Sequence, residues 1–591
     1  MQSRPETFYI NEVLNFKSEV QSIKTKLLLL ALVRLLVFLS MAGGIYLTID
    51  FSPWPIVIGV VGFAIFLFLV SRYADLKLHK ERVSYLIKIN QDEVDRMTGQ
   101  IVDTENGMAY IDDKHAFSSD IDLFGSGSFY EMVNRTELKE GSETLANTLK
   151  ANNIHNIVDK QEAIKELSNK PAWRHNYKAS AHMVKTKVSR QVIVDWLRQY
   201  QAFVPNYMRY LAISISIASI VLVGAYFFGF VSHIYVLFAL FVGLGITGGY
   251  VKRINKLSIY VSELKLAFSN YAKLLKQIED TDFQSEFCLI QKQKIESEGR
   301  LSSEILTEFS KYLSALDQRN NILFAVIGNG FLLWDAHQAY KIEKWIKSYG
   351  ALVEKWFETI EFFDAYNSLA TFVFNKPEYK YPKIDLEAKQ VIQAKALGHV
   401  MIDNKKRIDN DFEINTTSFR IITGANMAGK STFLRTIALT IVSANIGLPI
   451  CCESMTYRPI KLVTSMRNTD SLQDDSSYFF SELVRLKYIV DIIQSEPYFI
   501  ILDEILKGTN SKDKEEGSKK LMHKLSKTSS SGVIATHDLG LCEIANEIEA
   551  IENQYFDAEI FQGELKFDYT LKPGICQNMN ASFLLHKMEI V

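Results

Sequence analysis

Four long apolar stretches limit the folds open to this chain. Three of them contain no charged residue, and the first is interrupted only by Arg34. A helix of roughly 20 apolar residues crosses the ~30 Å hydrocarbon layer of a bilayer. The alternative, buried hairpins in a soluble protein, is disfavoured because soluble core helices rarely stay apolar on every face. We therefore predict four transmembrane helices in two hairpins. The stretches cover residues 27–49, 54–70, 210–230 and 234–250.

Basic residues flank each predicted hairpin on its outer sides. Lys24 precedes the first stretch, Arg72 follows the second, Arg209 precedes the third, and Lys252 follows the fourth. The two turns carry no Lys or Arg. By the positive-inside rule, both hairpins enter the bilayer from the cytoplasm and return to it. This pattern predicts an integral protein of the cytoplasmic membrane, with all other domains in the cytoplasm.

A phosphate-binding motif occupies residues 424–432, which read Gly-Ala-Asn-Met-Ala-Gly-Lys-Ser-Thr and fit Gly-x4-Gly-Lys-Ser. The glycines allow the backbone to bend so that its N–H groups point at phosphate oxygens. An apolar strand is predicted over 419–423 and a helix over 433–439, which is the context that this motif requires. The cofactors implied are ATP and Mg²⁺. The predicted nucleotide-binding residues of this loop are Gly424, Ala425, Asn426, Met427, Ala428, Gly429, Lys430, Ser431 and Thr432.

Further candidate catalytic groups follow two predicted core strands. The apolar run 498–502 ends in Asp503 and Glu504, and the run 532–536 delivers His537. Carboxyl ends of parallel strands lie beside the phosphate loop in a doubly wound sheet. We expect Ser431 and Asp503 to hold Mg²⁺, Glu504 to act as general base, and His537 to sense the γ-phosphate. The predicted catalytic residues are Glu504, His537 and Lys430.

Overall composition gives little further guidance. Lys and Arg number 66 and Asp and Glu number 68, a net charge of −2. Bulk charge therefore predicts no nucleic-acid partner, although a local basic groove can exist in a neutral protein. The five cysteines show no metal-ligand spacing, which is typical of buried thiols in a reducing compartment.

Taken together, these motifs resemble those of the MutS family of DNA mismatch repair ATPases. The family's Thr-Gly-Pro-Asn-Met-Gly-Gly-Lys-Ser-Thr is similar to Thr-Gly-Ala-Asn-Met-Ala-Gly-Lys-Ser-Thr at 423–432. Its Asp-Glu-Ile-Gly-Arg-Gly-Thr is similar to Asp-Glu-Ile-Leu-Lys-Gly-Thr at 503–509, and its Ala-Thr-His stands at 535–537. Its Ser-Thr-Phe-Met-x-Glu-Met signature resembles Ser-Tyr-Phe-Phe-Ser-Glu-Leu at 477–483. The resemblance is strongest over 396–591.

The resemblance implies partners as well as a reaction. Ser477 would reach the nucleotide of a partner subunit, which implies a homodimer joined through its ATPase domains. DNA binding is also implied. However, only 26 residues precede the first apolar stretch, which leaves no room for the family's mismatch-reading domain, and no strand-rich DNA clamp is evident. We therefore expect any DNA binding to lack mismatch specificity.

The sequence thus predicts a multidomain, membrane-anchored ATPase with an all-α core and lever region and a C-terminal α/β P-loop domain of the ABC type. ATP binding and hydrolysis in the dimer would drive conformational change, in a DNA-linked role. Alternatives are a membrane mechanoenzyme without DNA binding and a transporter-like ATPase. The transporter is weaker, because no Leu-Ser-Gly-Gly-Gln signature is present and four spans per chain is few. The expected segments are an N-terminal cytoplasmic piece (1–26), the first hairpin (27–70), the first core segment (71–207), the second hairpin (208–250), the lever with the second core segment (251–395), and the ATPase domain (396–591).

Overall fold

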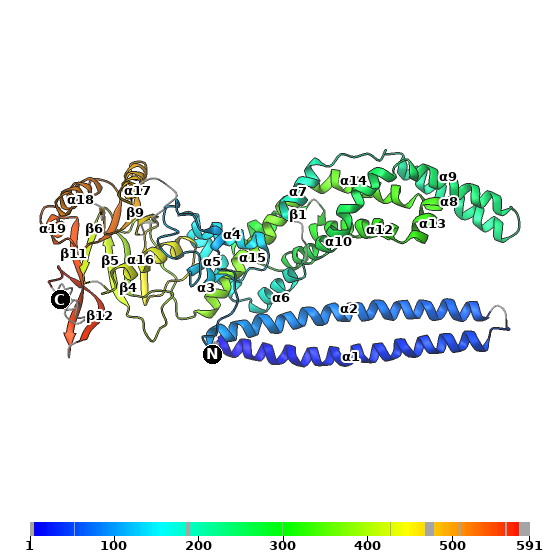
Figure 1. The fold of residues 1–591 in the computed structure, drawn as a ribbon, viewed down its shortest axis with the longest axis horizontal. Coiled ribbons are helices and arrows are strands. Elements are labelled where there is room, and N and C mark those ends of the chain that lie inside the picture. Colours follow the sequence, from blue (N-terminus) through cyan, green and yellow to red (C-terminus); the bar gives the residue numbers. More distant parts are fainter. Residues whose placement is uncertain are drawn as a thin grey trace. The chain divides into compact units, whose positions relative to one another are not determined.

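The protein is described from a computed structural model, in which the chain forms two compact units (Figure 1). Unit 1 contains Met1–Asp103, Pro171–Asp282 and Ile290–Asp364. Unit 2 contains Thr104–Lys170, Phe283–Leu289 and Ala365–Val591. Each unit therefore combines segments that are distant in the sequence. The structure describes residues 5–51, 54–184, 189–297, 299–425, 427–466, 478–506, 510–561 and 564–577.

A long helical hairpin, α1 (Pro5–Leu47) and α2 (Trp54–Met97), belongs to unit 1 (Figure 1). Both helices extend well beyond the apolar stretches of the sequence. The polar halves pack together around side chains such as Ile23 and Val83. The apolar halves expose their side chains, and Leu28 for example is 65% exposed. One hairpin therefore has a buried seam at one end and an apolar surface at the other.

The second hairpin differs from the prediction in its final helix. It comprises α8 (Met208–Phe227) and α9 (His233–Gly248), and α10 (Val251–Glu279) follows at once. Among the described residues, α1, α2 and α8 are long and apolar enough to cross a membrane. Helix α9 has only 16 residues and reaches span length together with Val251–Ile259, across a bend of 64°. Length and composition thus support three spans, or four if the bent pair is one.

A further apolar helix, α13 (Ile322–Leu332), packs on α8 and α9. Sequence analysis did not identify it, because at 11 residues it is too short for a span. Its contact with α9 depends on glycine: a Cβ built on Gly243 would lie 2.0 Å from the carbonyl oxygen of Gly330. Small residues that let helix backbones approach closely are characteristic of membrane helix pairs.

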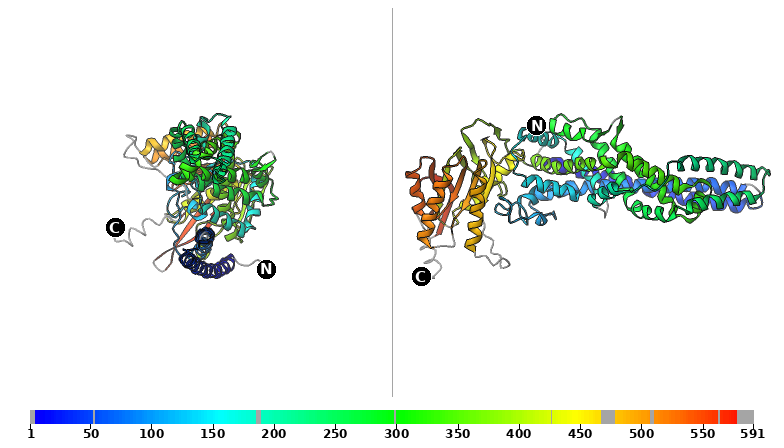
Figure 2. Two further views of the ribbon diagram at one scale, coloured as in Figure 1. Left: turned by 90° about the vertical axis from the view of Figure 1, so that its right-hand side faces the viewer. Right: turned by 90° about the horizontal axis from the view of Figure 1, so that it is seen from above.

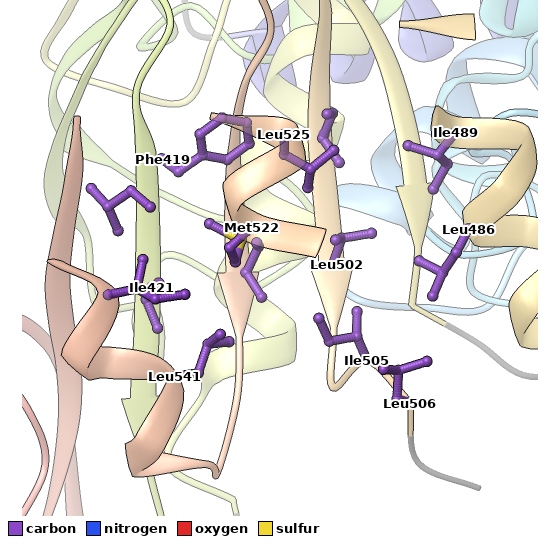
Figure 3. Close-up of a cluster of buried hydrophobic side chains, with 14 of the residues drawn as sticks. Phe419, Ile421, Leu486, Ile489, Leu502, Ile505, Leu506, Met522, Leu525 and Leu541 are labelled. Atoms are coloured by element: carbon purple, nitrogen blue, oxygen red, sulfur yellow. The ribbon is translucent and has the colours of Figure 1, made fainter. Parts of the chain in front are cut away.

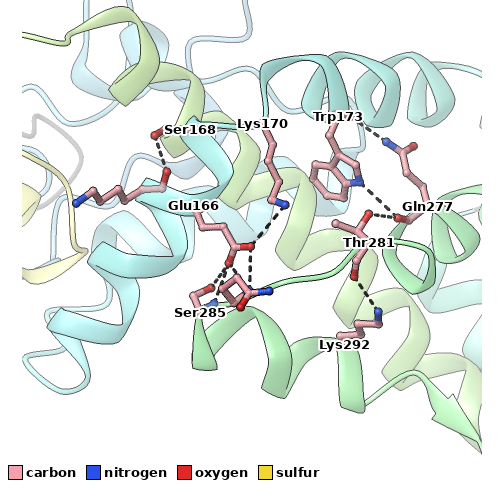
Figure 4. Close-up of polar contacts among 10 residues, drawn as sticks. Glu166, Ser168, Lys170, Trp173, Gln277, Thr281, Ser285 and Lys292 are labelled. Carbon is pink, nitrogen blue, oxygen red and sulfur yellow. Dashed lines mark hydrogen bonds and ion pairs between the residues drawn. The ribbon is translucent and has the colours of Figure 1, made fainter. Parts of the chain in front are cut away.

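The remaining helices of unit 1 form a packed bundle. Its aromatic core includes Phe309 stacked on Trp345, with ring centres 3.8 Å apart. Trp173 and Gln277 bond each other's backbone carbonyls, at 3.4 and 2.8 Å (Figure 4). The only strands in the described part of this unit are the two-residue β1 (Glu296–Ser297) and β2 (Arg300–Leu301). The other helices are α6 (Pro171–His182), α7 (Arg190–Gln199), α12 (Ser302–Asp317), α14 (Trp334–Tyr349) and α15 (Val353–Asn375), which continues into unit 2.

Unit 2 is built around a six-stranded sheet of order β12-β11-β6-β10-β9-β8. All neighbours pair in parallel except β11 and β12, which are antiparallel. A four-stranded sheet of order β3-β7-β4-β5 completes the unit. The strands of the larger sheet are β6 (Phe419–Gly424), β8 (Lys461–Ser465), β9 (Tyr498–Asp503), β10 (Ser531–Ala535), β11 (Ile551–Phe561) and β12 (Glu564–Pro573). Those of the smaller sheet are β3 (Lys383–Ile384), β4 (Gln390–Leu397), β5 (Asn410–Asn415) and β7 (Ser454–Tyr457).

Helices cover both faces of the larger sheet (Figure 2). On one face, Leu486, Met522 and Leu541 come from three helices and pack against strand residues such as Ile421 and Leu502 (Figure 3). Helix α16 packs against β6, β8, β9 and β10 and shares no residue with that cluster. The helices of this region are α16 (Lys430–Asn445), α17 (Tyr478–Ile492), α18 (Ser511–Leu525) and α19 (Leu539–Cys542).

The segment 104–170 belongs to unit 2 and contributes helices, not strands. Glu166 accepts hydrogen bonds from the backbone N–H groups of Gln284 and Ser285 and from the Ser285 hydroxyl at 2.8 Å (Figure 4). Asp120 accepts a bond from Thr464 on β8. These bonds attach the helical segment to the rest of the unit. Its helices are α3 (Phe129–Val133), α4 (Lys139–Lys150) and α5 (Ile157–Ser168), and the bonded segment leads into α11 (Glu286–Gln293).

The C-terminal sheet domain follows the sequence pattern closely. The strands predicted over 419–423, 498–502 and 532–536 each shift by at most one residue at either end. The helix predicted over 433–439 is longer at both ends and begins at Lys430. A helical N-terminal region with a C-terminal α/β sheet domain is therefore the fold of the chain.

Candidate functional site

The loop between β6 and α16 has a backbone that favours glycine. Gly424 has φ 149° and Gly429 has φ 103°, both in the region that L-residues rarely adopt. A Cβ built on Gly424 would also lie 2.6 Å from the carbonyl oxygen of Phe556. Met427 also has a positive φ, of 67°. The loop therefore turns sharply and ends where the free N–H groups of α16 begin.

Lys430, the first residue of α16, is buried and bonded to its own loop. Its Nζ donates to the carbonyl oxygens of Gly424 at 2.8 Å and Ala425 at 2.9 Å. Burial lowers the pKa of this lysine, while the nearby carboxylates of Asp503 and Glu504 act in the opposite direction. The ammonium is therefore held at the loop by two backbone oxygens, with two carboxylates nearby.

Ser431 and Asp503 form a second contact at the same edge of the sheet. The Ser431 hydroxyl donates to Oδ2 of Asp503 at 2.7 Å. Asp503 ends β9, which lies two strands from β6, with β10 between them. Mg²⁺ prefers hard oxygen donors such as hydroxyl and carboxylate groups. In nucleotide sites the ion is commonly bound by only one or two protein ligands together with phosphate oxygens. The pair therefore fits a magnesium ion, although the described residues contain no cluster of three or more His, Cys, Asp or Glu suited to a metal.

Glu504 and His537 meet at the ends of neighbouring strands. His537 Nε2 lies 3.0 Å from Oε1 of Glu504, and each side chain is about a quarter exposed, at 28% and 27%. Glu504 has φ 53°, an uncommon value for a non-glycine residue. Its N–H donates to Ala535 O at 2.9 Å, which fixes it to β10. Strained backbone held by a sheet is frequent at functional sites.

The side chains of Lys430, Ser431, Asp503, Glu504 and His537 all line one cavity of about 670 Å³ in unit 2. Sequence reasoning missed several other lining residues, including His399, Arg407 and Tyr569. Burial, with the Arg435 charge as a second cause, lowers the His399 pKa to about 4, so this imidazole is neutral near pH 7. Asn410 ties β5 to β12 by donating to Tyr569 O at 3.0 Å and accepting from Leu571 N at 2.7 Å. Only the tertiary fold brings these positions to the loop.

The other predicted nucleotide-binding residues occupy different environments. Ala425 and Ala428 are buried, Met427 is 78% exposed, and Thr432 lines the cavity in the first turn of α16. Asn426 and Ser477 lie outside the described residues. The structure thus brings together Lys430, Ser431, Asp503, Glu504 and His537, while the roles given to them remain predictions.

The described residues form an α/β sheet domain, with a glycine-containing loop between a parallel strand and a helix and with carboxylates at a neighbouring strand end. This is the arrangement that the phosphate-binding motif predicts. Residues 420–587 match the family model of MutS domain V. The resemblance of the sequence to the MutS family is therefore confirmed over the part of the chain that contains this domain.

Curated relatives show the same resemblance. The chain is 27% identical over 226 residues to DNA mismatch repair protein MSH4 of Arabidopsis thaliana, covering 37% of this chain and 28% of that protein. It is 31% identical over 234 residues to DNA mismatch repair protein MutS of Persephonella marina, covering 38% and 26%. It is 35% identical over 159 residues to DNA mismatch repair protein MSH3 of Debaryomyces hansenii, covering 26% and 15%. The chain thus spans less than a third of the length of these relatives.

Proposed function

We propose that this protein is a membrane-anchored, MutS-like ATPase. The observation that supports the proposal best is the convergence of the glycine loop, the Ser431–Asp503 pair and the Glu504–His537 pair on one cavity. The family match covers the same region. Each group has a part in the attack of water on a γ-phosphate, with release of ADP and phosphate.

The phosphates would bind to the N–H groups of the loop and the first turn of α16. Lys430 would exchange its two carbonyl contacts for phosphate oxygens. Ser431 and Asp503 would hold Mg²⁺, which when bound supplies positive charge to the phosphates. Glu504 would accept a proton from the attacking water. We assign His537 to orienting that carboxylate, in place of the γ-phosphate sensing expected from the sequence, because its Nε2 lies 3.0 Å from Glu504. The exposure of Glu504 leaves room for a water molecule beside it.

Steady-state hydrolysis of Mg-ATP by the full chain in detergent tests this assignment. We expect Glu504→Gln to bind nucleotide and to lower kcat by about 10²–10⁴-fold, the usual effect of losing a general base. Glu516→Gln removes an exposed carboxylate on α18 and should leave kcat unchanged. Lys430→Ala should lose nucleotide binding, while Lys520→Ala should retain it. A Glu504→Gln enzyme with normal turnover would exclude Glu504 as the base.

We further propose that both apolar hairpins span the cytoplasmic membrane and keep the ATPase domain in the cytoplasm. Support comes from the length and composition of α1, α2 and α8 and from the exposure of their apolar side chains. Phe227 and Phe230 in the second hairpin are each 81% exposed. Such a surface is stable in lipid and costly in water.

Extraction and labelling test the membrane arrangement. The protein should remain in the membrane pellet after carbonate treatment. A cysteine introduced at Ser232, between α8 and α9, should react with an impermeant thiol reagent from outside the cell, whereas one at exposed Asp403 should react only after permeabilisation. Labelling at Ser232 that also requires permeabilisation would reverse the proposed orientation.

The proposed assembly is a homodimer with two composite sites, in which Ser477 of one subunit reaches the nucleotide of the other. Ser477→Ala and Lys430→Ala chains should each be impaired. When mixed, they should form heterodimers with one intact site and recover some of the activity. Subunit exchange without recovery would remove Ser477 from the partner's site.

The proposed cellular role is linked to DNA, because the relatives are DNA mismatch repair proteins by name. The affinity of the protein for DNA should fall steeply as the salt concentration rises, because contacts to phosphates depend on salt. The affinities for matched and mismatched duplexes should differ only a few-fold. A tenfold preference for the mismatched duplex, about 1.4 kcal/mol, would show that the protein contains a mismatch-recognising region that the sequence did not indicate. Salt-independent or undetectable binding would favour the alternative, a membrane mechanoenzyme or transporter-like ATPase without DNA.

A further inference from the structure

A second cavity, of about 300 Å³, lies within unit 1 between α8, α12 and α14. Its charged lining is mainly basic: Arg209 from α8, Arg300 from β2, and Lys341 and Lys344 from α14. His337 lies one turn before Lys341 and also lines the cavity, since residues three and four apart share a helix face. The only carboxylate in the described lining is Glu308 of α12.

Glu308 is already engaged by other groups in this cavity. Oε2 of Glu308 lies 2.9 Å from a guanidinium nitrogen of Arg300, and its other oxygen accepts a bond from the Tyr312 hydroxyl. The Lys341 ammonium lies over the Tyr312 ring, 5.6 Å from its centre. Within the described residues of the chain, no carboxylate lies within ion-pair distance of Arg209, Lys341 or Lys344. Three cations therefore face one cavity without a direct counter-ion.

The titration of the lining groups agrees with this excess of positive charge. Burial lowers the pKa of His337, and the charges of Lys341 and Arg209 lower it further. Burial also lowers the pKa of Lys341, against the attraction of Glu308. An anion in the cavity would oppose these shifts by stabilising the charged forms.

The cavity adjoins the elements proposed to contact lipid. Arg209 lies in the first turn of α8, directly before the apolar stretch 210–230. Helix α14 follows α13 after Leu333, and α13 packs on α8. Ile322 and Leu323 of α13 are 78% and 71% exposed. Apolar surface and uncompensated cations thus occur on neighbouring elements, as at the boundary between acyl chains and headgroups.

We propose that this cavity binds the phosphate-bearing headgroup of an anionic phospholipid, whose acyl chains lie along α8 and α13. The proposal rests on the membrane arrangement proposed above, because that arrangement places Arg209 at the cytoplasmic surface of the bilayer. A free phosphate ion would satisfy the same cations. The neighbouring apolar surface of α13 favours the lipid, since the acyl chains of a lipid bound in the cavity could lie against that surface, whereas a soluble ion has no apolar part.

Native mass spectrometry of the full chain in neutral detergent, with equal amounts of phosphatidylglycerol and phosphatidylcholine, tests the proposal. We expect about ten times more phosphatidylglycerol than phosphatidylcholine to stay bound to the wild-type protein, because a few basic residues near an anionic headgroup favour it by about this factor. Lys341→Gln/Lys344→Gln should abolish this preference. The matched control Lys347→Gln/Lys355→Gln removes two lysines outside the cavity and should keep it. The charge-preserving Lys341→Arg/Lys344→Arg should keep it as well.

Two further measurements separate the alternatives. If millimolar inorganic phosphate raises the thermal midpoint of wild type but not of Lys341→Gln/Lys344→Gln, and phosphatidylglycerol is not preferred, the ligand is soluble phosphate and the lipid assignment is wrong. Equal retention of both lipids without any phosphate effect would exclude an anion site. Carbonate extraction of the same wild-type protein reports on the membrane arrangement alone. A protein that stays in the membrane but shows no lipid preference would refute only this inference.

Discussion

The cavity beside the glycine loop and the cavity between α8, α12 and α14 each contain a lysine whose pKa is lowered by burial, but the lysine's charge is balanced differently in each. Lys430 donates to two backbone carbonyls and lies near Asp503 and Glu504. Lys341 lies over an aromatic ring, and the carboxylate in its cavity is bonded to Arg300 and Tyr312. The first cavity is shaped by backbone, the second by side chains from separate elements.

Because of this difference, the two cavities should not tolerate substitutions equally well. A site shaped by backbone depends on φ values and close approaches that a single Cβ can destroy. A site made of long side chains can lose one of them with little effect on the fold, because surface charges contribute little to stability.

Gly424→Ala should have the largest effect. Its Cβ would lie 2.6 Å from Phe556 O at a φ of 149°, so we expect loss of nucleotide binding and destabilisation by about 3 kcal/mol. Chemical denaturation and nucleotide binding measure both quantities. Gly245→Ala is the control, because nothing lies within 4 Å of its Cβ. A stable Gly424→Ala protein that still binds ATP would show that the loop is not determined by its backbone.

Ser431→Ala removes the hydroxyl bonded to Asp503. We expect the Mg²⁺ concentration for half-maximal ATPase activity to rise by about 100-fold, because a predicted metal ligand is lost. A magnesium titration of the steady-state rate measures this. Ser443→Ala, at the far end of α16, should leave the titration unchanged. An unaltered magnesium requirement in Ser431→Ala would place the ion elsewhere.

His537→Gln should have a smaller effect, because the imidazole is proposed to orient Glu504 and not to react. We expect kcat to fall by about tenfold with little change in KM, as for loss of an orienting partner. His523→Gln removes an exposed imidazole on α18 and serves as the control. A rise in KM at constant kcat would instead indicate that His537 contributes to nucleotide binding.

Lys341→Gln should have the smallest effect on stability. In lipid-free detergent we expect the midpoint of thermal unfolding to stay constant or rise, with a free-energy change of no more than about 1 kcal/mol. Lys347→Gln on the same helix provides the comparison. A marked loss of stability in Lys341→Gln alone would mean that the contact of this lysine with Tyr312 already stabilises the fold and that the contrast with Lys430 is false.

The candidate nucleotide site was largely predictable because its residues follow strands in the sequence. A buried strand that ends in Asp503-Glu504 and another that leads to His537 place those side chains at one edge of a parallel sheet. Arg407 and Tyr569 lie on other connections and strands, and only the fold brings them to the same cavity. Sequence pattern predicts local geometry, but it does not predict the pairing of β11 with β6, which brings the β11–β12 hairpin beside the loop.

In the helical region, the sequence predicted the helices but not how they pack. Its apolar stretches predicted α8 and most of α9, because an uncharged run of that length has few other structures available. The bend after α9 and the packing of α13 were not predictable. The packing depends on Gly243 and Gly330, which resemble any other glycine of an apolar segment until their backbones are seen in contact.

The close approach of Gly243 and Gly330 has a consequence for how the chain is made. These residues are separated by all of α10, α11 and α12, so α9 leaves the ribosome well before its partner exists. In the proposed membrane arrangement, the glycine surface of α9 first meets lipid and exchanges it for α13 only later in synthesis. The second hairpin would therefore be inserted before α13 exists, and α9 and α13 could pack together only after residue 330 has been translated.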